Sequence, residues 1–204
     1  MAFSPDGSQL AYTDSEGLHV RQLRTGQTRA LGPCLEACPV GWSSDGLQLL
    51  TTARGGLRRV VVSTGASSVV RLPLGWDITG GLDVNNRGRV VMSGCANDEA
   101  ALMQVDITGD QPVVSLTAGR VAVVRDPRWS PDGRRVAYIR LAPGTGTDSV
   151  LTVDAQGRDG RGVPLADGEY ALHLDWSARG RLAALVRGPG TRTRWWSCTR
   201  TGRP

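Results

Sequence analysis

The chain alternates short apolar segments with clusters of turn-forming residues along its whole length. The apolar segments are four to six residues long and read LAYT, LQLLTT, RVVMS, RVAYIR and RLAALV. Runs of this length and composition, bounded by Gly, Pro, Asp and Ser, are typical of strands. No segment of useful length repeats its apolar residues with the 3.6-residue period of a helix. The pattern predicts an all-β chain.

Two families of turns recur in phase with the apolar segments. The first family reads FSPDG, WSSDG, VNNRG, WSPDG and WSARG, and its copies end at Gly7, Gly46, Gly88, Gly133 and Gly180. The second family follows 19 to 24 residues later, around Gly26, Gly65, Gly109, Gly157 and Gly202. Successive first turns are 39, 42, 45 and 47 residues apart. This spacing is close to the length of one four-stranded propeller blade.

The repeat predicts a single β-propeller domain over residues 1–204. Its five units, each of four strands named a to d, lie at about 1–31, 39–72, 81–116, 127–165 and 170–204. Strand d is visible only four times, and the first strand a has about three residues. Because an incomplete blade exposes a sheet edge, we expect the chain to be part of a six- or seven-bladed ring, shortened by truncation or by a misassigned start. A loose ring of five blades is the alternative.

The first turn family resembles the signature of the TolB-type, WD-repeat-like β-propeller family, an aromatic-Ser-Pro-Asp-Gly turn followed by a short apolar strand. Residues 3–7 and 129–133 match it fully, and residues 42–46 lack only the proline. Residues 176–180 keep the aromatic, serine and glycine, whereas residues 84–88 keep only the glycine. The resemblance covers essentially the whole chain and implies the fold, because these residues build turns and core. TolB itself is a periplasmic protein-interaction platform, but the resemblance implies no particular partner here.

The charge balance adds little to this picture. All 24 basic residues are arginine, the net charge is +5 and the pI is about 9.6. The arginines are scattered, without a basic helix or a basic run interleaved with stacking aromatics, so we expect no nucleic-acid partner. No apolar run approaches the roughly 20 residues of a membrane span. We expect an extracytoplasmic location (periplasmic, secreted or lipoprotein) if the full-length protein has an upstream signal.

In a propeller of this kind, the loops from strand d to a and from strand b to c share one face, the usual ligand face. The sequence places ten polar or reactive residues there: Cys34, Cys38, Trp76, Asp77, Cys95, Asp98, Glu99, Arg125, Asp126 and Asp148. Trp76, Asp77, Arg125 and Asp126 are the candidate ligand contacts. For Trp76 the alternative is a side chain that plugs its own loop.

The cysteines leave two interpretations open. Either a disulfide forms among Cys34, Cys38 and Cys95, which would indicate an oxidising compartment, or the three are unpaired loop thiols. A zinc site is not expected, because His19 and His173 both occupy strand positions and no second cysteine pair exists. Cys198 lies in the last apolar segment and is expected to be packed core.

No catalytic motif is present in the sequence. It contains no G-x-S-x-G, no H-E-x-x-H, no glycine-rich phosphate loop and no DxDxDG calcium loop. We therefore expect no catalytic residue, metal or cofactor, and a non-enzymatic module that binds a protein or small ligand at the loop face. The alternatives are the propeller of a prolyl-oligopeptidase-like serine peptidase lacking its hydrolase domain, and the sensor domain of a receptor kinase.

Overall fold

A computed structural model describes residues 1–34, 38–96, 99–107, 112–117, 123–141 and 148–188. Within these ranges the chain forms 18 strands and no helix. Consecutive strands pair antiparallel in five separate sheets, four of them four-stranded. The predicted all-β propeller architecture is confirmed.

The sheets follow one another along the chain. The first contains β1 (Ala2–Phe3), β2 (Gln9–Asp14), β3 (Gly17–Gln22) and β4 (Thr28–Ala30), and the second contains β5 (Val40–Trp42), β6 (Gln48–Ala53), β7 (Gly56–Val61) and β8 (Ser67–Arg71). The third contains β9 (Trp76–Val84), β10 (Arg89–Ala96), β11 (Glu99–Asp106) and β12 (Val114–Ser115). The fourth contains β13 (Val123–Trp129), β14 (Arg135–Leu141), β15 (Asp148–Asp154) and β16 (Arg161–Pro164). Of the fifth, the described residues include β17 (Tyr170–Trp176) and β18 (Leu182–Arg187). The last apolar segment, which contains Cys198, lies outside the described residues.

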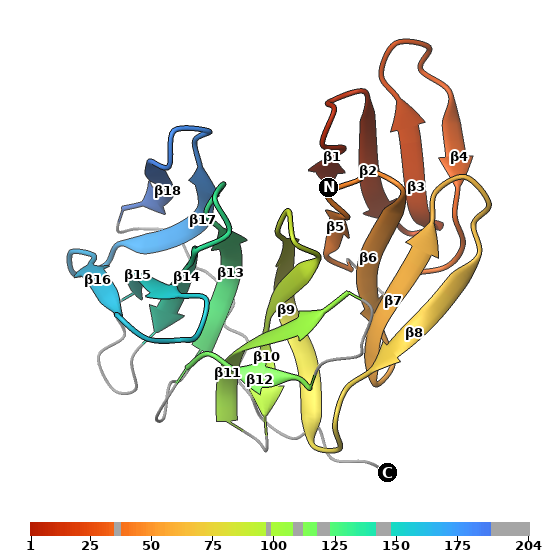
Figure 1. The fold of residues 1–204 in the computed structure, drawn as a ribbon. Helices are drawn as coiled ribbons and strands as arrows, with labels where there is room; N and C mark the ends of the chain where they lie inside the picture. Colours follow the sequence, from red (N-terminus) through yellow and green to blue (C-terminus); the bar gives the residue numbers. More distant parts are fainter. Residues whose placement is uncertain (35–37, 97–98, 108–111, 118–122, 142–147, 189–204) are drawn as a thin grey trace.

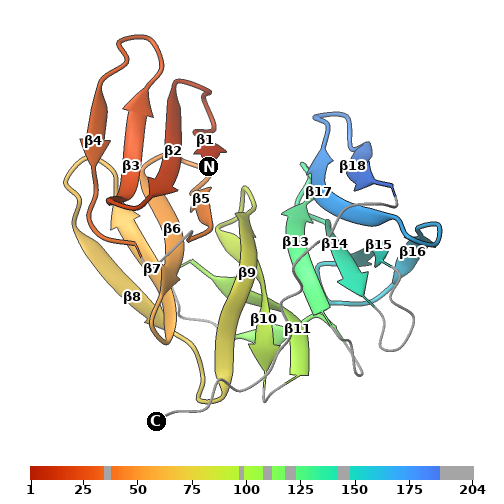
Figure 2. The same ribbon diagram turned by 180° about the vertical axis from the view of Figure 1, so that it is seen from behind.

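The five sheets are the blades of a propeller and are arranged along an arc (Figures 1 and 2). The first strand of each blade contacts the first strand of the next, from β1 to β5, β9, β13 and β17. We call these five strands the inner strands. The fourth strands, such as β4, β8 and β16, lie farthest from this line (Figure 1).

The turn between the first two strands of a blade is held by a serine and an aspartate. Ser4 Oγ donates to Asp6 Oδ1 (2.6 Å) and accepts from the amide of Gln9 (2.9 Å), while Asp6 Oδ1 accepts from the amide of Ser8 (3.0 Å). Gly7 completes the turn with a φ of +70°, which favours glycine. The hydrogen bond from the Ser4 hydroxyl, together with those from the amide and hydroxyl of Ser8, lowers the pKa of Asp6 to about 2.

The same turn recurs in the second and fourth blades. Ser43 and Asp45, and then Ser130 and Asp132, make the equivalent bonds. In the third blade Asn85 replaces the pair, because its Oδ1 alone accepts from the amides of Arg87 and Arg89. The serine and aspartate of the repeated motif therefore have a structural role in fixing a turn.

The hydrophobic core lies between neighbouring blades. One cluster joins the first blade to the second through Leu18, Trp42 and Leu49, and another joins the third to the fourth through Leu102, Trp129 and others. Trp42 and Trp129, at the aromatic position of the repeat, are thus buried between blades, as expected for core packing, whereas Phe3 at the same position of the first blade is exposed. Trp42 and the half-buried Trp176 also make a hydrogen bond across a junction: Trp42 Nε1 donates to Ala2 O (3.0 Å) and Trp176 Nε1 to Arg128 O (3.2 Å).

Seven of the ten residues predicted to lie in loops are instead in strands, and that placement was wrong. Cys95, Glu99 and Asp148 lie in β10, β11 and β15, and the other four lie in inner strands. Trp76 and Asp77 are the first two residues of β9, and Arg125 and Asp126 lie within β13. These strands extend further toward the loop face than the apolar pattern indicated, because each pairs with a long second strand. Within the described residues, no helix is long and apolar enough to cross a membrane.

Candidate functional site

The loop that connects the first two blades is closed by a disulfide. Cys34 and Cys38 are joined, with their Cα atoms 6.2 Å apart. Thr13 Oγ1 donates to Cys38 O (3.2 Å), which ties the loop to β2 of the first blade. Cys95, on β10 of the third blade, is also disulfide-bonded. Cys198 lies outside the described residues.

Of the candidate ligand contacts, Trp76 and Asp77 are adjacent but differ in environment. Trp76 is half-buried and packs against the hydrophobic cluster of the second and third blades. Asp77 is exposed, pairs in the sheet with Cys95, and accepts a hydrogen bond from the amide of Ile78 (2.9 Å). Glu99 is exposed at the start of β11, and Asp98 lies outside the described residues.

Arg125 forms a buried ion pair with Asp148, whose side chain is 0% exposed. Asp148 also accepts a hydrogen bond from the amide of Ala171 (2.9 Å), and Arg125 donates to the carbonyl of the same residue (2.9 Å). Burial raises the pKa of Asp148, and the Arg125 guanidinium opposes that shift. Because Ala171 belongs to β17, the pair connects the fourth blade to the fifth.

Asp126 belongs to a different group, which lies between β13 and β17. Its carboxylate is 2.7 Å from Arg128 Nη2 and 3.1 Å from His173 Nδ1, and it accepts a hydrogen bond from the amide of Leu174. Arg128 Nη2 lies 3.4 Å from the same His173 nitrogen. Asp126 has a φ of +49°, at a point where the register of β13 against β14 shifts. This bulge turns neighbouring side chains of β13 toward β17.

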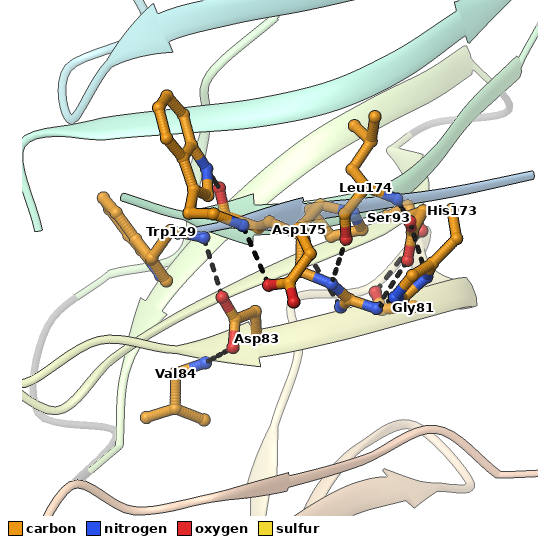
Figure 3. Close-up of polar contacts among 12 residues, drawn as sticks. Gly81, Asp83, Val84, Ser93, Trp129, His173, Leu174 and Asp175 are labelled. Atoms are coloured by element: carbon orange, nitrogen blue, oxygen red, sulfur yellow. Dashed lines mark hydrogen bonds and ion pairs between the residues drawn. The ribbon is translucent and has the colours of Figure 1, made fainter. Parts of the chain in front are cut away.

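Asp83 adds a third inner strand to the group. Its carboxylate reaches from β9 to the fourth blade, where it accepts the amide of Trp129 (2.7 Å), and it also accepts the amide of Val84 (2.9 Å) (Figure 3). Burial raises the pKa of Asp83; Arg128 lowers it and the Asp175 carboxylate raises it. Asp175, on β17, is exposed and accepts the amide of Trp176 (2.8 Å).

We refer to Asp83, Asp126, Arg128, His173 and Asp175 as the inner charged cluster. It combines three carboxylates, one guanidinium and one imidazole from three successive inner strands. With the imidazole neutral, the cluster has a net charge of about −2 on a chain of net charge +5. Its exposed members are His173, whose side chain is 53% exposed, and Asp175.

Reasoning from the sequence missed most of this cluster, although a signal was present. Asp83, Arg128 and Asp175 each stand directly before the aligned aromatic position of the repeat, which is occupied by Val84, Trp129 and Trp176. Equivalent positions on neighbouring inner strands lie side by side in a propeller. An alternating acid, base and acid at that position is therefore a readable pattern.

The cluster has no arrangement typical of a metal centre. Among the residues that the structure describes, no three His, Cys, Asp or Glu side chains are grouped so that they could hold a metal ion. The described partners of His173 are Asp126 and Arg128, and no serine or cysteine is among them. The geometry suits recognition of a charged or hydrogen-bonding group.

The comparisons with known proteins support the fold. No known family model matches the sequence, and no curated protein sequence matches it. A protein assigned as TolB from Agrobacterium tumefaciens is similar in structure, with a TM-score of 0.72 and 20% identity over 91% of this chain and 72% of that chain. TolB from Acinetobacter baumannii has a TM-score of 0.67 and 17% identity, over 93% of this chain and 46% of that one.

A third solved structure, of puromycin hydrolase, has a TM-score of 0.57 and 20% identity, over 89% of this chain and 32% of that one. The chain thus spans between about one third and three quarters of these structures. At such identities the likeness shows the fold alone. The chain is therefore a β-propeller, with the blade architecture that TolB also has.

Proposed function

We propose that this protein is a non-enzymatic, TolB-like binding module, and that the inner charged cluster is its contact surface for a protein or peptide. The observation that carries the proposal is the convergence of five charged or titratable side chains from three inner strands. Two of them, His173 and Asp175, remain exposed. Residues that only stabilise a blade would not need to be charged at the same position of successive inner strands.

The charge of the cluster favours a partner with basic groups. Arg128 neutralises one of its three carboxylates and Asp83 is partly shielded by burial, but Asp175 is exposed with its only described hydrogen bond to its own strand. A lysine or arginine side chain of a partner would find an exposed carboxylate acceptor at Asp175. Charge-assisted hydrogen bonds of this kind are about twice as strong as neutral ones.

We also propose that the protein works outside the cytoplasm. The Cys34–Cys38 disulfide supports this location, since disulfides persist in oxidising compartments and are rare in the cytosol. The similarity to TolB structures is consistent with an exported bacterial propeller.

The binding proposal can be tested with a displayed library of random peptides selected against the whole chain. We expect selected peptides to be rich in Arg and Lys and to bind with a micromolar Kd by calorimetry. Asp175→Asn should weaken binding about fivefold to tenfold, which corresponds to about 1.0–1.4 kcal/mol. Glu16→Gln is the matched control, because Glu16 is an exposed carboxylate on the β2–β3 turn of the first blade.

Two results would overturn the proposal. One is a selection in which no peptide rises above background. The other is a set of peptides that bind equally well to wild type, Asp175→Asn and Glu16→Gln.

A second candidate function is the propeller part of a larger hydrolase. The similarity to puromycin hydrolase favours it, because this chain matches only 32% of that protein. In that case the inner charged cluster would guide substrate toward a separate catalytic domain. Sequencing the DNA on both sides of the region that encodes this chain distinguishes the candidates. An in-frame domain with a G-x-S-x-G motif supports the hydrolase, and an upstream kinase domain would support a sensor domain.

A further inference from the structure

A groove of about 600 Å³ opens between the first and second blades. Its walls come from β2, β3 and β4 of the first blade and from the two turns of the second blade around Leu47 and Val62. These are the turns of the face opposite the predicted loop face, so the groove is separate from the inner charged cluster. Its volume is within the range of ligand pockets, about 300–1,000 Å³.

The repeat explains why the groove is present at this junction. Val20 pairs with Ala11, and the same position of the second blade is Arg59, paired with Leu50. Arg59 extends across its junction, donating to Ser68 Oγ (3.2 Å) and to the carbonyl of the third-blade residue Ile107 (3.4 Å). Val20 is too short to fill the equivalent space.

The third and fourth blades fill this space in other ways. Gln104, a longer and buried side chain, has the equivalent place in the third blade, where it pairs with Val91. In the fourth blade the residue is Thr152, but Arg135 reaches it, with Nη2 donating to Thr152 Oγ1 (3.0 Å). The first blade has Gln9 at the position of Arg135. A short valine beside a short glutamine therefore leaves the first junction open.

The lining combines an aliphatic wall with polar side chains. Val20, Leu47 and Val62 form the apolar part, and three glutamines, Gln9, Gln22 and Gln27, provide carboxamides. None of these three carboxamides makes a hydrogen bond with the described part of the chain, and Gln9 and Gln22 face each other across β2 and β3. A carboxamide is both donor and acceptor, so each can pair with a peptide group.

Arg29 is the one charged residue among the described residues of this lining. Its Nη1 donates to the carbonyls of Val62 (3.1 Å) and Ser63, which holds the guanidinium across the junction. A guanidinium has five N–H donors, so others remain for a carboxylate of a ligand. Among the lining residues that the structure describes, none carries a carboxylate that would compete for them.

We infer that this groove binds an extended peptide segment with an aliphatic side chain and a nearby carboxylate. The aliphatic side chain would contact Val20, Leu47 and Val62, the peptide groups would pair with the glutamines, and the carboxylate would meet Arg29. A peptide suits the lining because the wall is aliphatic and offers no aromatic face for stacking. The inference does not rest on the proposed function, since it concerns different residues on a different face.

The test uses two pools of blocked pentapeptides on the isotope-labelled full chain, followed by amide NMR shifts. Both pools carry a central leucine; one has glutamate two residues later and the other glutamine. We expect the glutamate pool, at peptide concentrations up to about 1 mM, to shift the amide resonances of residues 20–29 and 46–48. The glutamine pool should bind about fivefold more weakly, corresponding to loss of one exposed charge-assisted contact.

Three variants localise the effect. Arg29→Gln should remove the difference between the pools, whereas Arg24→Gln, on an exposed arginine outside the lining, should leave it intact. Val20→Arg introduces the arginine that the second blade has at this position and should block the binding of both peptide pools. If Val20→Arg does not fold, Gln22→Ala is used in its place and should weaken the binding of both peptide pools. The inference is overturned if neither pool shifts the groove amides, or if the shifts persist unchanged in Arg29→Gln and the groove-blocking variant.

Discussion

The serine of the repeated turn should stabilise the fold through one hydrogen bond that no other group can replace. Ser130 is 7% exposed, and its Oγ accepts the amide of Arg135 (2.9 Å) while donating to Asp132 Oδ1 (2.6 Å). In Ser130→Ala the amide loses this partner at a half-buried position. An unsatisfied buried donor costs about 1–3 kcal/mol, so we expect the free energy of unfolding to fall by about 1–2 kcal/mol.

The loss should also depend on pH. The Ser130 hydroxyl is the largest cause that lowers the pKa of Asp132 below the ordinary 3.8. A carboxyl with a lowered folded-state pKa contributes stability above its unfolded pKa and loses it as the pH falls through the folded value. Ser130→Ala removes the largest cause of that lowered pKa, so its cost should be greatest near neutral pH and shrink below about pH 4.

Urea unfolding followed by tryptophan fluorescence measures both effects, with equal m-values showing that only stability has changed. Ser177→Ala is the matched control. Ser177 accepts the amide of Arg181 (3.0 Å) in the equivalent turn, but Arg179 stands where the aspartate would be and the site is exposed. The control should cost less and show no such pH dependence. A Ser130→Ala cost that is negligible, or that grows on acidification, would refute the reasoning.

Three further predictions have defined outcomes in the same unfolding assay. Trp42→Phe should lower the free energy of unfolding by about 1 kcal/mol more than Trp129→Phe does. The reason is that the indole N–H of Trp42 donates to the first blade, whereas that of Trp129 has no described partner. Equal costs would contradict this expectation. Asp148→Ala should lower the free energy of unfolding by about 2–4 kcal/mol, because it leaves the partly buried Arg125 and the buried amide of Ala171 without their acceptor. A cost below that of Trp129→Phe would argue against the buried pair. Replacing both Cys34 and Cys38 by alanine should cost about 2 kcal/mol for so short a loop, and an unchanged unfolding midpoint would show that the disulfide does not stabilise the protein.

The fold could be predicted from the sequence because its turns are determined by residues close together in the chain. Gly7, Gly46, Gly88, Gly133 and Gly180 all have positive φ in the structure, and the chemistry of a turn depends on residues within a few positions of it. The aligned aromatic position was likewise readable as interblade core, since aromatic residues recur there at blade spacing.

The candidate site was harder to predict because it depends on contacts between blades. Asp126 was expected in a loop, but it lies at a bulge of β13 whose position is set by pairing with β14. Asp83 becomes part of the cluster only because β9 lies beside β13, which lets its carboxylate reach the amide of Trp129. His173 appeared to be an ordinary strand residue, and its ion pair with Asp126 joins residues of different blades.

The most direct test of the binding account is a hydrogen-exchange footprint of a library-selected peptide on the full chain. If the inner charged cluster is the contact surface, exchange should slow in segments 80–84, 123–129 and 171–176, while β4 and β8 remain unchanged. Protection confined to outer strands, or absent from all three inner segments while the peptide is bound, would contradict the account.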